Sequence, residues 1–354
     1  MKKLKGVFVC LALASMLASC ASSPVVTEPP AGTESYYVRA DGNDRNAGTS
    51  EDAPFKTLAR ALEVASNSNV KKITVIGTLI GSTSTEHLRA ILFQGIDENT
   101  KHPSEILITG KPNASAAEKA ILTSNAEHRA LDIMNAAIRL EHIEISGCQG
   151  GAVSVMMGLL TLAEGAKITN NKGDRNVGIL SYASSVIIRD NAEVSHNEGE
   201  YNAGIFLYNG STVLLRDNAL ISNNRATYNG GGIAVSTSTL LIKDNAMITN
   251  NSAGDFGGGI MAYGEEEDDK SSQIVITDNA NIARNSAQAG GGIFLNNNTV
   301  LAIFMSTVRI TENTASFGLG GVGRTAGASV SGHIDSTIVN NQAPQIPDIG
   351  IYGN

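Results

Sequence analysis

The chain has 354 residues, of which 37 are glycine, and aromatic residues make up only 5% of it, with no tryptophan. Asp and Glu number 34 against 26 Lys and Arg, and the net charge of −8 at pH 7 argues against nucleic acid as a partner, because phosphate backbones repel an acidic surface. The low aromatic content weakens a carbohydrate-binding interpretation, since sugar clefts commonly rest on aromatic platforms.

Residues 1–19 have the composition of an export signal. Three lysines lie within the first five residues, and an apolar stretch follows that is too short to span a membrane. The stretch ends in Leu17-Ala18-Ser19-Cys20. This resembles the lipobox, the cleavage site of bacterial lipoproteins, and implies that residues 1–19 are removed and that Cys20 carries lipid. The alternative is an ordinary secretory signal beside an incidental cysteine.

Residues 20–35 are rich in Ser, Pro, Thr and Gly and are expected to form a flexible tether. Lipid on Cys20 would anchor this tether in a membrane. Ala21, not aspartate, follows the cysteine. By resemblance to diderm lipoproteins this favours the outer membrane over the inner membrane, so we expect a lipid-anchored protein of the bacterial cell envelope. Cys10 belongs to the signal and Cys20 would be lipidated, so Cys148 is left alone and no intrachain disulfide is expected.

The folded domain is expected to span 36–354, and its first part, 36–66, combines a strand, a turn and a helix. Residues 37–49 read YVRADGNDRNAGT and residues 53–62 read APFKTLARAL. The segment resembles the opening of pectin-lyase-like β-helix proteins. The resemblance implies a right-handed parallel β-helix, a fold that permits polysaccharide lyase or hydrolase activity.

The helix of this opening is predicted over Pro54 to Ala65. Its apolar residues share one face, which can cover the open end of the first coil: Phe55, Leu58, Ala61, Leu62 and Ala65. In the turn before it, Asp41 and Asn43 suggest a Ca²⁺ loop, but Arg45 occupies the third ligand position. A turn is therefore expected there.

Less regular coils are predicted next, with strands over 73–80, 106–108, 121–122, 131–133 and 138–145. Two insertions depart from plain coiling, a loop over 111–119 and an acidic run over 265–270. An acidic run is usually a solvated loop, and a metal site is the alternative.

Residues 150–351 repeat one motif, and each copy opens with an apolar residue. These opening residues are Val153, Ile179, Ile205, Ile233, Ile260, Ile293, Val322 and Ile351. They recur every 26 to 33 residues, which indicates a solenoid. Within a copy the apolar spacing is two, so each copy should supply three short strands. The sequence thus predicts an all-β, single-stranded right-handed parallel β-helix with an N-terminal capping helix.

Each copy closes with an asparagine three residues after an apolar one. The closing residues are Asn171, Asn197, Asn224, Asn251, Asn285, Asn313 and Asn341. In-register amides at a turn can hydrogen-bond to the coils above and below, at a spacing of about 4.8 Å. We predict a structural ladder rather than catalytic groups.

A carboxylate also recurs, each time followed by Asn-Ala, at Asp190, Asp217, Asp244 and Asp278. Stacked like charges repel, so this column should face water or be neutralised. One interpretation is a row of Ca²⁺ sites, because hard cations take oxygen ligands, and no other cofactor is expected. The favoured interpretation is that each Asp caps its own turn. Basic residues precede the first three, but neighbours in a strand point to opposite faces.

The repeats resemble those of polymorphic outer membrane proteins, which carry Gly-Gly-Ala-Ile and Phe-x-x-Asn. Gly150-Gly151-Ala152-Val153 and Ile168-x-x-Asn171 stand in those places. The resemblance implies a surface-exposed β-helix that is linked to adhesion. The first hypothesis is a non-catalytic envelope lipoprotein with a binding, adhesion or structural role, whose ligand is a host protein, an envelope protein or a polysaccharide.

The alternative is a polysaccharide lyase or glycoside hydrolase. Lyases of this fold need clustered carboxylates that hold Ca²⁺ beside a Lys or Arg base, and hydrolases need a carboxylate pair. The acidic positions here recur equivalently in successive coils, so no catalytic residue is assigned. An active site would be sought in the early coils or near Arg175, Arg189 and Arg216, and one compact mixed-charge cluster in a groove would favour the enzyme.

Overall fold

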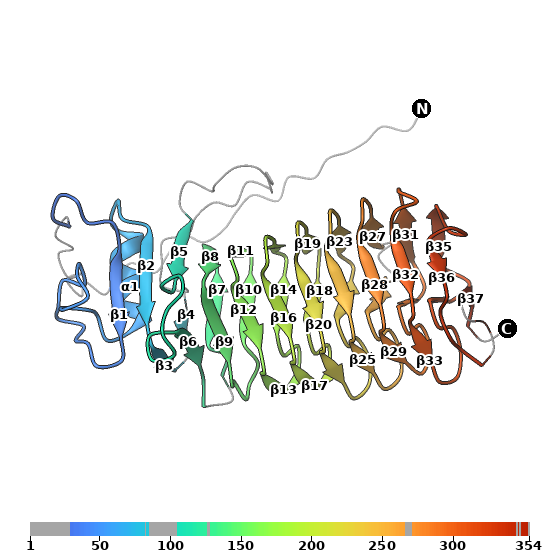
Figure 1. Cartoon of the computed structure of the whole chain (residues 1–354), viewed down its shortest axis with the longest axis horizontal. Coiled ribbons are helices and arrows are strands. Elements are labelled where there is room, and N and C mark those ends of the chain that lie inside the picture. The colour runs from blue at the N-terminus through green and yellow to red at the C-terminus, as the bar shows by residue number, and fades with distance from the viewer. Residues whose placement is uncertain are drawn as a thin grey trace, which may run out of the picture.

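A computed structural model describes residues 29–81, 83–84, 105–125, 128–265, 271–344, 346 and 348–352. The predicted export signal, the predicted lipidation site Cys20 and all but Glu265 of the acidic run 265–270 lie outside these residues. In the described part, successive turns of the chain stack in a row along the long axis of the molecule (Figure 1). Every strand pairing between turns is parallel, so the architecture is the predicted parallel β-helix.

Four parallel sheets, here named A to D, run along the helix. Sheet A contains β1 (Tyr36–Arg39), β2 (Lys72–Ile76), β5 (Ile106–Thr109), β8 (Ala137–Glu141), β11 (Leu159–Ala163), β15 (Ser185–Ile188), β19 (Thr212–Leu215), β23 (Thr239–Ile242), β27 (Ser272–Ile276), β31 (Thr299–Ile303) and β35 (Ser329–Gly332). Sheet B contains β3 (Thr78–Ile80), β6 (Ala120–Thr123), β9 (Ile143–Ser146), β12 (Lys167–Thr169), β16 (Glu193–Ser195), β20 (Leu220–Ser222), β24 (Met247–Thr249), β28 (Asn281–Ala283), β32 (Arg309–Thr311) and β36 (Ile338–Val339).

Sheets C and D complete each coil. Sheet C contains β4 (Thr83–Ser84), β7 (Leu131–Met134), β10 (Val153–Met156), β14 (Ile179–Tyr182), β18 (Ile205–Tyr208), β22 (Ile233–Ser236), β26 (Ile260–Tyr263), β30 (Ile293–Leu295), β34 (Val322–Arg324) and β37 (Ile349–Ile351). Sheet D contains β13 (Lys172–Arg175), β17 (Glu198–Tyr201), β21 (Arg225–Ala226), β25 (Ser252–Ala253), β29 (Ser286–Ala287) and β33 (Thr314–Ala315). A regular coil visits the sheets in the order A, B, D and C.

The prediction of three strands per copy is wrong, because each regular coil has a fourth strand, which lies in sheet D. Its later strands are only two residues long, as in Arg225–Ala226. The backbone of each closing asparagine fixes them in place: the amide of Ser252 donates to the carbonyl of Asn224, 2.9 Å away. The segment after the asparagine is therefore held parallel to its equivalent although it is too short to show an apolar period.

The opening apolar residues form one buried column in sheet C. Val153 pairs with Ile179, Ile179 with Ile205, and the pairing continues to Val322. All of these side chains are buried in the core. The last predicted member is wrong, because Val322 pairs with Ile349 and not with Ile351. A shift of two residues keeps the same face of the strand inward, so the sequence pattern does not distinguish the two.

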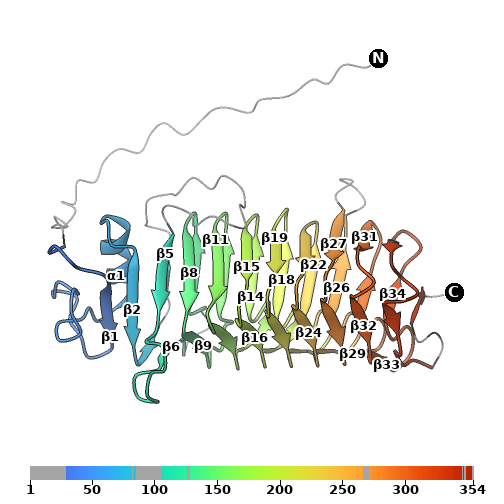
Figure 2. The same cartoon turned by 45° about the horizontal axis from the view of Figure 1, so that its top comes forward.

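The N-terminal end of the β-helix is covered by α1 (Leu58–Ser66), which lies against the first strands (Figure 2). Its predicted apolar face is buried. The helix begins at Leu58 rather than Pro54, because Phe55 forms a parallel bridge with Val38 and is held in an extended segment. Thr57 is the N-cap, and its hydroxyl accepts from the amide of Arg60.

The turn before α1 anchors the start of the helix. The Asn43 side chain accepts from the amide of Arg45 within the turn. The carboxylate of Asp44 accepts the amides of Lys56 and Thr57, both at 2.9 Å, and also the Thr57 hydroxyl. A carboxylate beside a helix N-terminus is favourable, so this Asp-rich turn fixes where the cap begins.

Candidate functional site

The seven closing asparagines form a continuous buried column. In the first six, the side-chain amide nitrogen donates to the side-chain oxygen of the asparagine one coil further on, at 2.9 to 3.1 Å. That oxygen also accepts the backbone amide of the preceding asparagine. The second amide hydrogen goes to a backbone carbonyl of the preceding coil, such as that of Ile221 for Asn251. The column therefore offers no free amide group to a ligand along its length.

The ends of the column differ from its middle. At the start, the backbone amide of Cys148 donates to Asn171, so the cysteine stands where the preceding asparagine would be. Burial raises the pKa of the Cys148 thiol, which keeps it protonated. At the far end, the Asp348 carboxylate accepts both the backbone and the side-chain amide of Asn341, each at 3.0 Å. The hydrogen bonds that run along the asparagine column thus end at the Asp348 carboxylate, which accepts the last two.

The aspartate column lies at the turns from sheet A to sheet B, in the left-handed backbone region: Asp190, Asp217, Asp244 and Asp278, with φ from 54° to 57°. Each of the last three carboxylates accepts the backbone amide of the aspartate one coil earlier, at 3.1 to 3.3 Å. The caps are therefore made between coils, not within each turn as the favoured interpretation had it. Among the described residues, His, Cys, Asp and Glu nowhere gather in threes at a spacing suited to a metal ion.

Two arginines beside the aspartate column form ion pairs with its carboxylates. Arg189 lies 3.0 Å from the Asp190 carboxylate, and Arg216 lies 3.4 Å from that of Asp217. The expectation that such neighbours diverge was wrong, because the positive φ of each aspartate ends the strand and turns its side chain back toward the preceding residue. Arg175 lies elsewhere, over the Tyr201 ring at 4.9 Å, so the three arginines do not form one neighbourhood.

An aromatic stripe crosses the outer face of sheet C and reaches the C-terminal end of the described chain. Its members are Tyr182, Phe206, Tyr208, Phe256, Tyr263, Phe294 and Tyr352. They follow the register of the sheet: Tyr182 pairs with Tyr208, while Phe206, Ala234, Met261 and Phe294 align in successive coils. Seven of the sixteen Tyr and Phe residues thus gather on one face.

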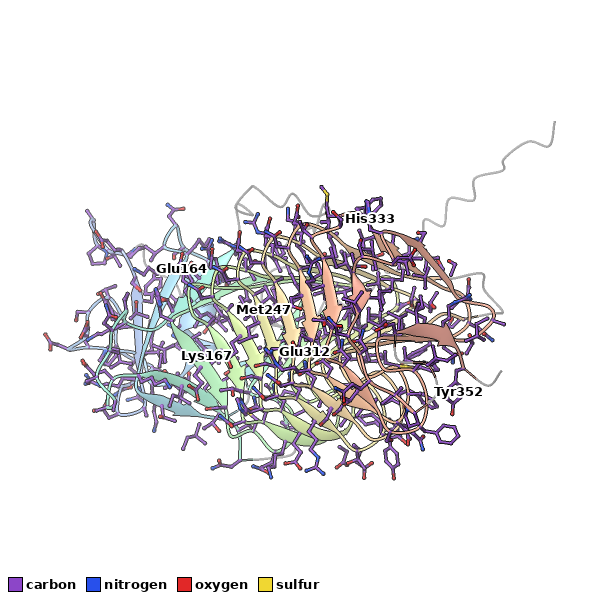
Figure 3. All side chains as sticks on the ribbon, turned by 45° about the vertical axis from the view of Figure 1, so that its right-hand side comes forward. Glu164, Lys167, Met247, Glu312, His333 and Tyr352 are labelled. Carbon is purple, nitrogen blue, oxygen red and sulfur yellow. The ribbon has the colours of Figure 1, made fainter. Side chains whose placement is uncertain are left out.

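One end of the aromatic stripe is packed and the other is open. Phe256, Phe294 and Tyr352, the last labelled in Figure 3, contact one another with ring centroids 4.6 to 5.6 Å apart. Phe294 is buried, whereas Tyr208 is 36% exposed and stands 5.7 Å from Tyr182 and 6.0 Å from Phe206. Burial raises the pKa of the Tyr263 hydroxyl, which stays protonated and can donate.

A hollow of about 280 Å³ lies on the outer face of sheet A, at the N-terminal coils. Its walls come from segments far apart in the sequence: Tyr37, Glu51, Lys72, Thr74, Leu107, Thr109, Gly110, Lys111, Pro112, Glu141 and His142. Acidic and basic side chains meet here in coils that do not repeat. The sequence points to the early coils in general, but nothing in it joins these particular residues.

The carboxylates of the hollow are already paired. Lys111 holds Glu51 at 2.7 Å and Glu118 at 3.1 Å, and Arg139 forms an ion pair with Glu141. The two contacts raise the pKa of Lys111, so it remains an ammonium. Lys72 makes no ion pair with a described residue. Within the described part of the chain, the hollow thus combines paired acids with an unpaired cation.

A comparison with family models agrees with the fold: a model described as a right-handed β-helix region matches residues 102–246. Among solved structures, a rhamnogalacturonan lyase is similar at 13% sequence identity, covering 84% of each chain with a TM-score of 0.39. No curated protein matches the sequence. The chain is a right-handed parallel β-helix protein. No helix among the described residues has the length and apolar composition required to cross a bilayer.

Proposed function

We propose that the mature protein is a lipid-anchored β-helix of the bacterial cell envelope that binds a polysaccharide on the outer face of sheet C and does not cleave it. The aromatic stripe carries this proposal. The half-buried ring of Tyr182 and the exposed ring of Tyr208 belong to successive coils, which repeat at a strand spacing of about 4.8 Å. Tyrosine offers an apolar ring face and a hydroxyl at once, which suits the apolar faces and hydroxyl edges of sugars.

The repeated polar columns support a scaffold rather than a catalyst. The asparagine amides bond to one another, and the aspartate carboxylates accept amides from the adjacent coil. A catalytic carboxylate must be available to a substrate proton or a metal ion. These groups instead maintain the register between coils, and the outer side chains are left to make the contacts with a ligand.

Affinity electrophoresis through gels that contain soluble β-glucan or galactomannan tests the proposal. The protein should be retarded, and Tyr208→Ala or Tyr182→Ala should restore mobility, since the first removes an exposed ring of the stripe and the second the half-buried ring beside it. Phe304→Ala is the matched control, because Phe304 is an exposed aromatic residue on sheet A's side of the coil. Equal retardation of all variants, or none of the wild type, would contradict polysaccharide binding at this face.

The second candidate function is a polysaccharide lyase or hydrolase, and the mixed-charge hollow on sheet A is the observation in its favour. Its two lining carboxylates, Glu51 and Glu141, are each held by a cation. An enzyme would have to release one of these pairs to use the acid. Binding at the hollow requires no such release.

A further inference from the structure

The hollow on sheet A has a composition that selects a particular kind of small molecule. Its lining residues come from β1, β2, β5 and β8 and from the loops after Asp44 and Thr109. The ion pair between Lys111 and Glu51 ties those two loops together across a sequence separation of 60 residues. The strands at the hollow are held by parallel sheet pairing, and this ion pair connects the two loops.

Each carboxylate at the hollow has a cationic partner, whereas one of its cations forms no ion pair with a described residue. Glu51 and Glu118 bind Lys111, and Glu141 binds Arg139. Lys72, on the exposed start of β2, lines the same hollow and makes no ion pair with any described residue. An ammonium that forms no ion pair within the described part of the chain, beside carboxylates that already have partners, favours an anionic guest.

The remaining lining residues indicate which chemical groups the rest of the ligand should carry. Leu107 and Pro112 offer apolar surface, and the Tyr37 ring lies at the same hollow. The backbone at Gly110 lies close to the turn at His142, since a Cβ on Gly110 would come within 2.2 Å of the His142 carbonyl. This close approach holds the Gly110 loop against the end of β8 and fixes that part of the wall.

We propose that the hollow binds a small ring-bearing carboxylate, with its carboxylate on Lys72 and its ring against Tyr37, Leu107 and Pro112. The volume of about 280 Å³ lies just below the usual range for small-molecule sites, which suits a compound with a single ring. This site is separate from the aromatic stripe on sheet C, so the inference does not depend on the proposed polysaccharide binding.

Three probes with one ring and different charge test the inference: 4-hydroxybenzoate, 4-hydroxybenzamide and tyramine. Isothermal titration of the mature chain should show binding of 4-hydroxybenzoate and at least about ten-fold weaker binding of the other two, the difference that one charge-assisted hydrogen bond supplies. Stronger binding of tyramine would show that Glu51 or Glu141 is the group available to ligands and would overturn the proposal, as would absent binding of 4-hydroxybenzoate.

Variants locate the site. Lys72→Ala should weaken 4-hydroxybenzoate binding about ten-fold or more, and Lys72→Arg should retain it. Lys167→Ala is the matched control, since Lys167 is an exposed lysine on sheet B that pairs with Glu193. Tyr208→Ala should leave 4-hydroxybenzoate binding unchanged, which separates this site from the aromatic stripe. Equal binding by wild type and Lys72→Ala, with unchanged melting temperatures, would place the carboxylate elsewhere and refute the assignment.

Discussion

Gly232 and Asn251 lie in direct contact. Gly232 precedes Ile233, the opening apolar residue of one copy of the repeat, and Asn251 is the closing asparagine of the same copy. A Cβ on Gly232 would come within 3.0 Å of the Asn251 side-chain nitrogen and within 2.5 Å of the Gly259 carbonyl. The same relationship recurs one coil further on between Gly259 and Asn285. The glycine of one segment therefore leaves the space that the buried asparagine of the other occupies.

Gly232→Ala should destabilise the protein by about 1–3 kcal/mol, the range for overpacking a filled interior. The methyl group would push on a backbone carbonyl and on a ladder amide, neither of which can move without disturbing the next coil. Thermal unfolding measures the change. Gly173→Ala is the control, because the nearest atom to its Cβ would be 3.3 Å away and its φ is not positive. Equal melting temperatures for the two variants would contradict the packing argument.

Asn251→Ala should lower the melting temperature without changing polysaccharide binding. The substitution removes the acceptor of both the backbone and the side-chain amide of Asn224. Each buried group left without a partner costs about 1–3 kcal/mol. Asn218→Ala is the matched control, since Asn218 is an exposed asparagine of the same repeat. An unchanged melt with lost binding would make Asn251 a ligand-binding residue instead.

Substitutions of Asp348 test the C-terminal end of the asparagine column separately from its middle. Asp348→Asn keeps a side-chain oxygen that can accept from Asn341, whereas Asp348→Ala leaves two amide groups without their acceptor. We expect the Ala variant to melt at a lower temperature and the Asn variant to stay close to wild type. Hydrogen exchange at the amide of Asn341 should rise in the Ala variant. A larger loss in Asp348→Asn than in Asp348→Ala would contradict this role.

The fold can be predicted from the sequence because the same pattern of apolar residues occurs in every copy of the repeat. A fixed interval between apolar residues requires stacked coils, and the amphipathic pattern up to Ala65 requires a cover for the first coil. The strands of sheet D were missed for a physical reason. Two-residue strands such as Ser286–Ala287 contain no period, and only the bonds from the neighbouring ladder reveal them.

The candidate sites follow from register and not from composition. The low aromatic content argues against sugar binding, yet parallel stacking places Tyr182 directly beside Tyr208 and Phe206 in line with Phe294. The aromatic percentage is an average over the whole chain, whereas stacking of the coils brings aromatic residues at equivalent positions side by side. The hollow on sheet A is harder to foresee, because Lys72 and His142 belong to coils that share no motif.

Cys20→Ala should abolish lipid attachment and release the protein from membranes. The basic and apolar start followed by Leu17-Ala18-Ser19-Cys20 motivates this prediction, since acyl chains on the cysteine would provide the anchor. Radioactive palmitate supplied to cells should label the wild type and not the variant, and detergent partitioning should change in parallel. Ser19→Ala is a control that keeps a small residue before the cysteine. Persistent label in Cys20→Ala would refute lipidation at this residue.

The purified mature protein should not cleave polyuronates, with or without Ca²⁺. An eliminating enzyme of this fold needs carboxylates that hold Ca²⁺ together with a nearby base. In the aspartate column, the oxygens of Asp217 and Asp244 accept backbone amides, and Asp217 also lies beside Arg216. In the hollow, Glu51 and Glu141 are ion-paired. Each of these acids therefore already has a partner that Ca²⁺ would have to displace.

Incubation with polygalacturonate and with alginate, followed by the absorbance of unsaturated product, measures this activity. We expect no increase in absorbance over the buffer control. Turnover that disappears on chelation would contradict the prediction, and Glu141→Gln and Asp217→Asn would then tell which acids act. Loss of turnover in Glu141→Gln alone would place catalysis in the hollow on sheet A, because Asp217 belongs to the turns between sheets A and B. The reverse result would show that a repeated column, which here maintains the coil register, also holds the metal ion.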